Sequence, residues 1–238
     1  MNNFLNSTSS VSEFVGASEI GDTIGMCIPS VDPLLLGQLS VQKQYSVIGV
    51  LSARTGAGPQ IMAMDDAVKA TNTEVLDIEL PRDTKGGAGH GSLILIGGND
   101  PSDVRQAIQV ALDGLSKRFG DVYNSPAGHL ELQFTASASG ACHLAFGAPI
   151  GKAYGLICGA PSGIGVVMGD TAVKTASVDV LSFASPAHGT SFSNEGILHI
   201  SGDSGAVRQA VIAGREVGLK LLAELGAEPV NDFPSYIK

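Results

Sequence analysis

The sequence predicts an α+β fold made of two similar units, and three observations support this prediction. The first is an internal repeat: AVKATNTEVLDIELP at Ala67–Pro81 and AVKTASVDVLSFASP at Ala172–Pro186 share six of fifteen residues. The second is the tetrapeptide VRQA, which occurs at 104–107 and again at 207–210. The third is the order of short apolar runs and amphipathic runs, which is the same in both halves. A duplicated unit of roughly 100 residues follows from these matches.

Each unit contains the elements of a mainly antiparallel four-stranded sheet with packed helices. In the first unit, the apolar runs Thr23–Ile28 and Tyr45–Leu51 predict strands. Asp32 followed by Pro33 predicts the start of a short helix between them. The remaining elements of this unit are a helix at Pro59–Thr71, strands at Glu74–Leu80 and Ser92–Ile96, and an amphipathic helix at Ser102–Lys117. In the second unit, strands are predicted near Leu130–Ala136, Lys152–Gly159, Asp179–Phe183 and Ile197–Ser201.

Pro126 and Gly128 mark the join between the units. We therefore expect a first unit over residues 19–125 and a second over residues 126–238. The first 18 residues are rich in Ser and Asn and are expected to form a mobile extension.

Composition excludes several classes of partner. The 238 residues include 14 Lys or Arg and 23 Asp or Glu, and the formal net charge of −9 disfavours binding to nucleic acid or anionic lipid. No apolar run approaches the roughly 18 residues that a membrane-spanning helix needs. Cys27, Cys142 and Cys158 are too few and too scattered for a disulfide framework, which favours a reducing cytosol.

Charged residues make up only 16% of the chain, against about 25% in a typical protein. A small-residue-rich α/β enzyme would have this composition, and so would a protein whose surface is covered by other subunits. Gly214 and Gly218 lie four apart in a predicted helix. They indicate either loose tolerance or a close approach of another backbone.

Two kinds of motif resemble catalytic or phosphate-binding segments but are better explained as helix caps and turns. GDSG at 202–205 resembles a serine-protease nucleophile segment, but NDPS at 99–102 occupies the same place in the first unit, so both are expected to cap a helix. The glycine-rich turns at 55–58 and 162–165 lack the Lys-Ser/Thr of a P-loop. The histidines, His90, His129, His143, His188 and His199, form no local pair with metal-ligand spacing, so no metal site is predicted.

Two long loops, Arg82–Gly91 and Ser185–Gly196, occupy the same position in the two units and are rich in Gly or Ser. Such loops either approach a ligand or a neighbouring copy closely, or form exposed tips. No acid–base or nucleophile–base pair is visible in the sequence, so an enzyme is not predicted.

Several segments resemble the bacterial microcompartment shell domain. GDTAVKTA at 169–176 and SGDSGAV at 201–207 match its signature in order. The duplication, with the segment Asp22–Leu39 ahead of the usual first strand, resembles the circularly permuted tandem-domain class. The segments Arg54–Pro59, Pro81–Gly91 and Asn231–Ile237 are similar to shell proteins of propanediol-utilising microcompartments.

The resemblance implies a non-enzymatic homotrimer without a cofactor, a pseudo-hexagonal tile that lies beside other shell proteins in a cytoplasmic microcompartment. It implies a central pore lined by Lys85, Gly86, Gly87, His188, Ser191, Phe192, Ser193, Asn194 and Glu195. It implies smaller pores through each subunit, lined by Arg54, Thr55, Gly56, His90, Gly91, Ser92 and Phe119. A small polyol such as 1,2-propanediol or glycerol would pass there.

The resemblance also assigns Lys69 and Lys174 to tile edges, although Ser30 and Ser137 stand near where the family's edge arginine is expected. Neither long loop contains a cysteine, so no iron–sulfur cluster is expected. The N-terminal extension would either bind encapsulated enzymes or be disordered. Two alternatives remain from the residues alone: a trimeric small-molecule sensor of the same fold, and an enzyme using Ser204 or His90.

Overall fold

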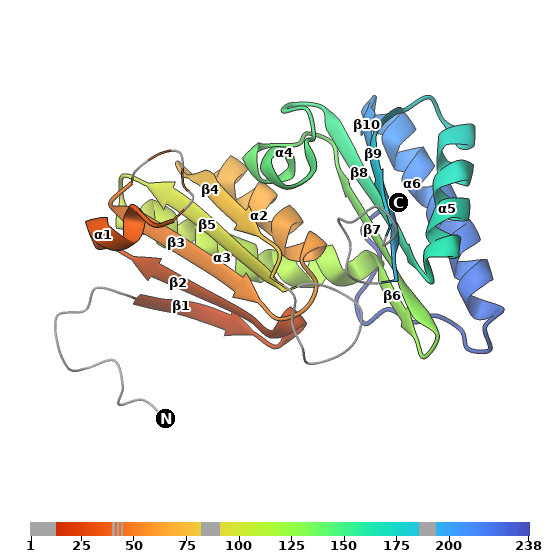
Figure 1. Ribbon diagram of the computed structural model, residues 1–238, viewed down its shortest axis with the longest axis horizontal. Helices are drawn as coiled ribbons and strands as arrows, with labels where there is room; N and C mark the ends of the chain where they lie inside the picture. The colour runs from red at the N-terminus through yellow and green to blue at the C-terminus, as the bar shows by residue number, and fades with distance from the viewer. Residues whose placement is uncertain (1–12, 40, 42, 44, 82–90, 186–193) are drawn as a thin grey trace.

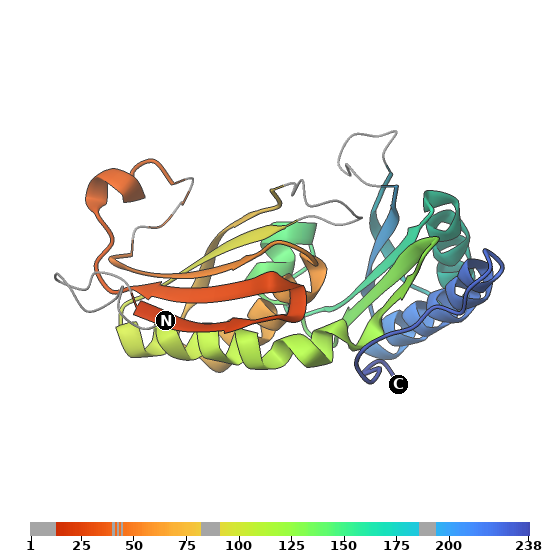
Figure 2. The same ribbon diagram turned by 90° about the horizontal axis from the view of Figure 1, so that it is seen from below.

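The computed structural model describes residues 13–39, 41, 43, 45–81, 91–185 and 194–238. Two units lie side by side, each a sheet with helices packed on one face (Figure 1). Seen from below, α3 (Pro101–Arg118) runs under the first sheet, while α5 (Ser162–Thr175) and α6 (Ser204–Ala223) cover the outer face of the second (Figure 2). No helix in the described part of the chain is long and apolar enough to cross a membrane.

The two sheets have the same topology, which confirms the duplication. The first has the order β1-β2-β3-β5-β4 and the second the order β6-β7-β8-β10-β9. The strands of the first unit are β1 (Glu13–Ser18), β2 (Thr23–Ile28), β3 (Val47–Ala53), β4 (Glu74–Glu79) and β5 (Ser92–Gly98). Those of the second are β6 (Val122–Ser125), β7 (Gly128–Thr135), β8 (Ala153–Ala160), β9 (Asp179–Ala184) and β10 (Gly196–Gly202). All neighbouring strands pair antiparallel.

The helices predicted near Pro33, Pro59, Ser102 and the GDSG segment begin within one residue of those positions. Besides α3, α5 and α6, the helices are α1 (Pro33–Leu36), α2 (Gly58–Ala70) and α4 (Gly140–Phe146). Asp32, Asp100 and Asp203 each accept a hydrogen bond from a backbone N–H in the first turn of α1, α3 and α6. The GDSG segment therefore caps a helix, and the nucleophile interpretation has no structural support.

Each sheet contains one strand more than the four predicted. Residues 13–18 form β1 and pair with β2, so this part of the expected mobile extension was wrongly assigned. Residues 122–125 form β6 in the segment taken as the join, and they close a tight turn in which Ser125 pairs with Gly128. β1 and β6 are both edge strands and mix polar with apolar residues. Neither therefore contains the short apolar run from which the other strands were predicted.

Each unit has its own hydrophobic core between sheet and helices. Ile94, Ile96 and Ile108 are among the buried side chains of the first core, and Leu130 and Ile157 among those of the second. In the second unit, a Cβ at Gly218 would lie 2.7 Å from Met168 Sδ. The close approach that Gly218 permits is therefore between α6 and α5 of the same chain, and not a subunit contact.

The units are joined through α4, which packs on α2 and β4. Asp65 of α2 is buried and accepts hydrogen bonds from the backbone N–H groups of Ser139 and Cys142 and from the Ser139 hydroxyl. Burial alone would raise the pKa of Asp65, but hydrogen bonds from Ser139, Lys69 and Cys142 outweigh it and hold this pKa below its ordinary value. The junction is thus fixed by a buried carboxylate in its ionised form.

Candidate functional site

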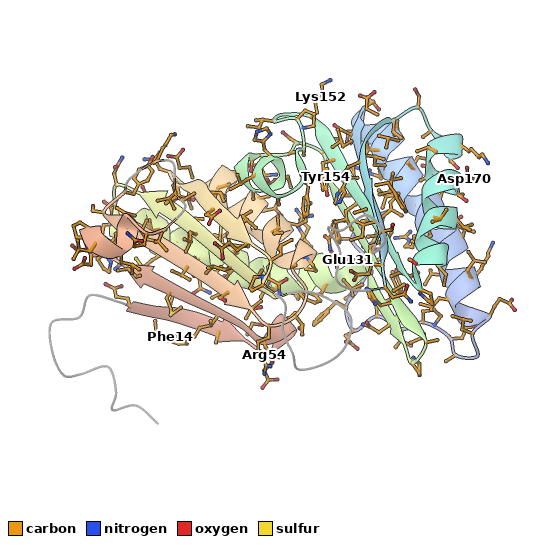
Figure 3. All side chains as sticks on the ribbon, viewed as in Figure 1. Phe14, Arg54, Glu131, Lys152, Tyr154 and Asp170 are labelled. Carbon is orange, nitrogen blue, oxygen red and sulfur yellow. The ribbon has the colours of Figure 1, made fainter. Side chains whose placement is uncertain are left out.

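A cavity of about 470 Å³ lies at the junction of the two units. Its wall is formed by Glu19, Ile20, Gly21, Thr55, Gly56, Phe119, Val122, Asn124, His129, Glu131, Glu195, Asp232 and Phe233. Glu131 and Glu195 also line a second cavity of about 190 Å³, together with Cys158 and His199. Figure 3 shows Glu131 near the middle of the molecule, between the two sheets.

The turn between β3 and α2 places Thr55 and Gly56 on the cavity wall. Gly56 has a φ of 111°, in the left-handed region that favours glycine. The amide of Gln60 donates to the Thr55 carbonyl oxygen at 2.9 Å and to the Thr23 hydroxyl at 3.2 Å. These bonds hold the turn against the first residue of β2 and so restrain this part of the wall.

The structure brings together three of the seven residues expected at a subunit pore: Thr55, Gly56 and Phe119 line the cavity. Gly91 and Ser92 do not line the cavity, and Ser92 is buried and pairs with Ala53 of β3. The Arg54 side chain is exposed and points away from the body of the molecule (Figure 3). His90 lies outside the described residues.

One polar face of the second sheet closes the far side of the cavity. Glu131 of β7 lies directly opposite Cys158 of β8 in the strand register. His129 Nε2 and Glu195 Oε1 are 2.7 Å apart. Burial, with a smaller contribution from the neighbouring Glu195, raises the pKa of the Glu131 carboxyl to about 8. Burial also raises the pKa of the Cys158 thiol, and the nearby Glu195 and Glu131 raise it further.

Most residues expected at the central pore lie outside the described residues: Lys85, Gly86, Gly87, His188, Ser191, Phe192 and Ser193. Asn194 Oδ1 accepts a hydrogen bond from the Ser162 N–H at 3.4 Å. Glu195 is buried at the junction cavity, where it contacts His129. In the chain it belongs to the expected pore loop Ser185–Gly196, but its side chain lies in the junction wall.

Sequence reasoning did not assign His129, Glu131 or Cys158 to a site. His129 and Glu131 line the larger cavity, and Glu131 and Cys158 line the smaller one. They lie on two strands that meet only in the folded sheet. A signal was present on β7, where His129, Glu131 and Gln133 alternate with the buried Leu130, Leu132 and Phe134. Such alternation indicates a strand with one apolar face and one polar face.

The two predicted edge lysines have different surroundings. The Lys69 side chain is 33% exposed, pairs with Asp65 at 2.9 Å and donates to the Ser137 carbonyl oxygen at 2.8 Å. The Lys174 side chain is 72% exposed and pairs with Asp170 at 2.7 Å. Lys69 thus contributes to the junction within the chain, whereas Lys174 stands on an open surface.

Comparison with known proteins supports one family for both units. The BMC domain family matches residues 48–126 and 153–228. The "Bacterial microcompartment shell protein PduB" of Limosilactobacillus reuteri is 74% identical over 238 residues, covering 100% of each chain.

Two solved structures are also similar over nearly the whole chain. A "trimeric bacterial microcompartment shell protein PduB" has a TM-score of 0.92 at 74% identity, covering 94% of this chain and 99% of that one. EtuB from Clostridium kluyveri has a TM-score of 0.89 at 48% identity, covering 97% of this chain and 100% of that one. With these matches to both of its units, the chain belongs to the bacterial microcompartment shell proteins and carries two BMC domains in tandem.

Proposed function

We propose that three copies of this chain form a closed ring of six BMC domains, a tile in the shell of a microcompartment that degrades 1,2-propanediol or glycerol. The relatives support this proposal, because one at 74% identity is named a shell protein PduB and a solved one is described as trimeric. Other shell proteins would be the partners at the edges of the tile.

The main structural support for the trimer is that equivalent faces of the two units differ: the face is covered in the first unit and exposed in the second. In the first unit, α4 covers α2 and β4. The second-unit elements that correspond to α2 and β4 are α5 and β9. They leave five large apolar side chains exposed: Val166, Val167, Val173, Val180 and Phe183. An apolar patch of this kind marks an interaction surface.

The element that would cover this face is present in the same chain. α1 connects β2 to β3 as α4 connects β7 to β8, so it is the counterpart of α4. Leu34 of α1 is 83% exposed, and Leu35 is also exposed. If α1 of one copy covers α5 and β9 of the next, the contact within the chain is repeated between chains. Such head-to-tail contacts form a ring when the rotation closes.

Each chain would contribute one path for small polar metabolites through its junction cavity. Thr55, Gly56 and the flanking backbone offer polar groups on a restrained wall, and a cavity of about 470 Å³ accommodates a three-carbon polyol. Passage requires weak binding, because a tightly held molecule would block the path. The expected N-terminal contact with encapsulated enzymes stays a proposal, since residues 1–12 lie outside the described part of the chain.

Light scattering and negative-stain electron microscopy on one sample of the purified protein test the tile. We expect a mass three times the 24.2 kDa of the chain, together with flat sheets. A monomer without sheets would contradict the tile.

Ligand-observed NMR with 1,2-propanediol or glycerol tests the path. The expected affinity is a Kd of about 1 mM or weaker. The Thr55→Trp variant, which fills the cavity, should lose the signal while remaining trimeric. Tight binding by a protein that forms no sheets would instead favour a sensor.

A further inference from the structure

Three different metal-ligand side chains converge where the second sheet faces the junction. His129 comes from β7, Cys158 from β8, and Glu195 from the residue before β10. One ligand atom from each lies within 4.8 Å of the other two. Because β8 pairs with both β7 and β10, the sheet itself holds these side chains together.

The donor set selects the class of metal. An imidazole nitrogen, a thiolate and a carboxylate oxygen together are typical ligands of Zn²⁺. In a tetrahedral zinc site with bond lengths of about 2.0–2.3 Å, neighbouring ligand atoms are about 3.3–3.6 Å apart. His129 Nε2 and Glu195 Oε1, at 2.7 Å, would separate slightly, and the widest pair would close by about 1 Å. These are side-chain adjustments and need no change in the strands.

A second observation points to a ligand at the same place. The Glu131 oxygen Oε1 is fully buried and has no hydrogen-bond partner among the described residues. Gly58 of α2 packs so closely on this oxygen that a Cβ there would overlap it. A buried carboxyl oxygen without a partner is costly, and a cation beside it would remove that cost.

The other two buried cysteines have no such surroundings. Cys142 Sγ lies 3.5 Å from Met62 Sδ, and Cys27 Sγ lies 4.0 Å from the Pro101 carbonyl oxygen. Neither belongs to a group of three potential ligands among the described residues. They are therefore matched controls for Cys158.

We propose that His129, Cys158 and Glu195 form a Zn²⁺ site, with Glu131 or a water molecule as the fourth ligand. The ion would enter through the junction cavity, toward which the His129 side chain is 15% exposed. Binding forms one Zn–N bond, one Zn–S bond and two Zn–O bonds, the second Zn–O bond being to the fourth ligand. The thiol proton of Cys158, and the carboxyl proton of Glu131 where Glu131 is the fourth ligand, pass to solvent without any electron transfer. All three ligands lie in one unit of one chain, so the site requires neither the trimer nor metabolite passage.

Titration of the full-length, metal-free protein with Co²⁺ under anaerobic conditions tests the site. We expect a thiolate-to-cobalt charge-transfer band that saturates at one ion per chain and disappears when Zn²⁺ is added. Cys158→Ser should lose the band, whereas Cys142→Ser and Cys27→Ser should keep it. His129→Gln and Glu195→Gln should weaken binding by at least about 10-fold.

A band that survives in Cys158→Ser, or no band in the wild-type protein, would overturn the proposal. Circular dichroism establishes that each variant is folded. X-ray absorption at the zinc edge of the wild-type protein decides the matter if Cys158→Ser does not fold. One sulfur among nitrogen and oxygen ligands is expected there, and a shell without sulfur would contradict the site. Solution mass is recorded in parallel, because loss of the trimer would count against the tile and not against the metal site.

Discussion

The two units share one topology but use the same surface differently. In the first unit, the face of α2 and β4 is covered by α4 and contains the buried Asp65. In the second, the corresponding face of α5 and β9 is open, and Asp170, the counterpart of Asp65, is exposed. The same surface thus serves an internal contact in the first unit and is available for a contact between chains in the second.

The two sheets also differ on the face that points away from the long helices. Gly49 and Gly155 are equivalent positions: a Cβ at Gly49 would meet Val104 of α3, and a Cβ at Gly155 would meet Val207 of α6. Three residues further along, the first unit has Ser52 where the second has Cys158.

Ser52 faces Ile24 across the strand pair, whereas Cys158 faces Glu131. Ser92 pairs with Ala53 as Gly196 pairs with Gly159, so the preceding residues, Gly91 and Glu195, also correspond. The first unit therefore has no counterpart of the Cys158 thiol or the Glu195 carboxylate, and the proposed zinc site belongs to the second unit alone.

The largest effect is expected from a charge on α1. Leu34→Asp would place a carboxylate against the apolar face of α5 and β9 of the next copy, where it could not be solvated. We expect the protein to elute as a folded monomer, measured by light scattering. Leu225→Asp, at an exposed leucine beyond the end of α6, should remain trimeric. A trimeric Leu34→Asp protein would show that α1 is not at the interface.

The next largest effect is expected on stability, where the equivalent residues Asp65 and Asp170 should differ. Asp65→Ala leaves the backbone N–H groups of Ser139 and Cys142 without their acceptor, whereas Lys69 keeps the Ser137 carbonyl oxygen. We expect a cost of about 2–4 kcal/mol in the free energy of unfolding. Asp170→Ala removes an exposed pair and should cost less than about 0.5 kcal/mol. Urea denaturation of both variants measures the difference. Equal losses would refute the contrast between the covered and the open face.

A pH effect of similar size is expected from His199. Burial lowers the pKa of His199 to about 4. The unfolded chain, with an ordinary His pKa near 6.5, therefore binds more protons at this residue between these values, so the contribution of His199 to the free energy of unfolding falls as the pH drops from about 6.5 to 4. The loss of this contribution is at most about 3 kcal/mol. Glu131, whose pKa is raised to about 8, contributes in the opposite sense between about 8 and its ordinary value. His199→Leu, which introduces the Leu95 side chain found in the first unit, should flatten this dependence.

Tyr154 donates to or accepts from His199 at 2.7 Å, so His199→Leu lowers stability at every pH. The test is therefore how the free energy of unfolding, measured by denaturant titration, changes with pH. His143→Gln is the control. An unchanged slope in His199→Leu would show that other groups carry the acid sensitivity.

The smallest effect concerns the long helices. A Cβ at Gly114 of α3 would lie 3.7 Å from the nearest neighbouring atom, so Gly114→Ala should stabilise the protein by about 0.5–1 kcal/mol. Gly218→Ala of α6 would crowd Met168 and should lose that gain or destabilise. Thermal unfolding separates the two variants, and a lower melting temperature for Gly114→Ala would contradict the room for a Cβ beside α3.

Local signals predicted most of the fold. Thr23–Ile28 was placed correctly from its apolar run, and α1 and α3 from the capping residues Asp32 and Asp100. These signals act within a few residues of the chain and can be read from it directly. β1 and β6 were missed because edge strands depend on pairing with a neighbour more than on their own side chains.

The candidate site was less accessible from the sequence. Thr55, Gly56 and Phe119 were reached through family resemblance and do line one cavity. The cluster of His129, Cys158 and Glu195 depends on the register of three strands, which no local spacing encodes. No metal site was predicted because no potential ligands have the local spacing of a metal site, and the sequence does not show which distant residues converge.

Cysteine cross-linking tests the proposed ring most directly. A chain carrying both Leu34→Cys and Val180→Cys should form covalent dimers and trimers with a short bifunctional maleimide, because α1 of one copy would lie on β9 of the next. Neither single variant should cross-link, since the contact joins two different surfaces. Cross-linking by either single variant alone, or a trimer of the double variant that does not cross-link, would contradict the proposed arrangement.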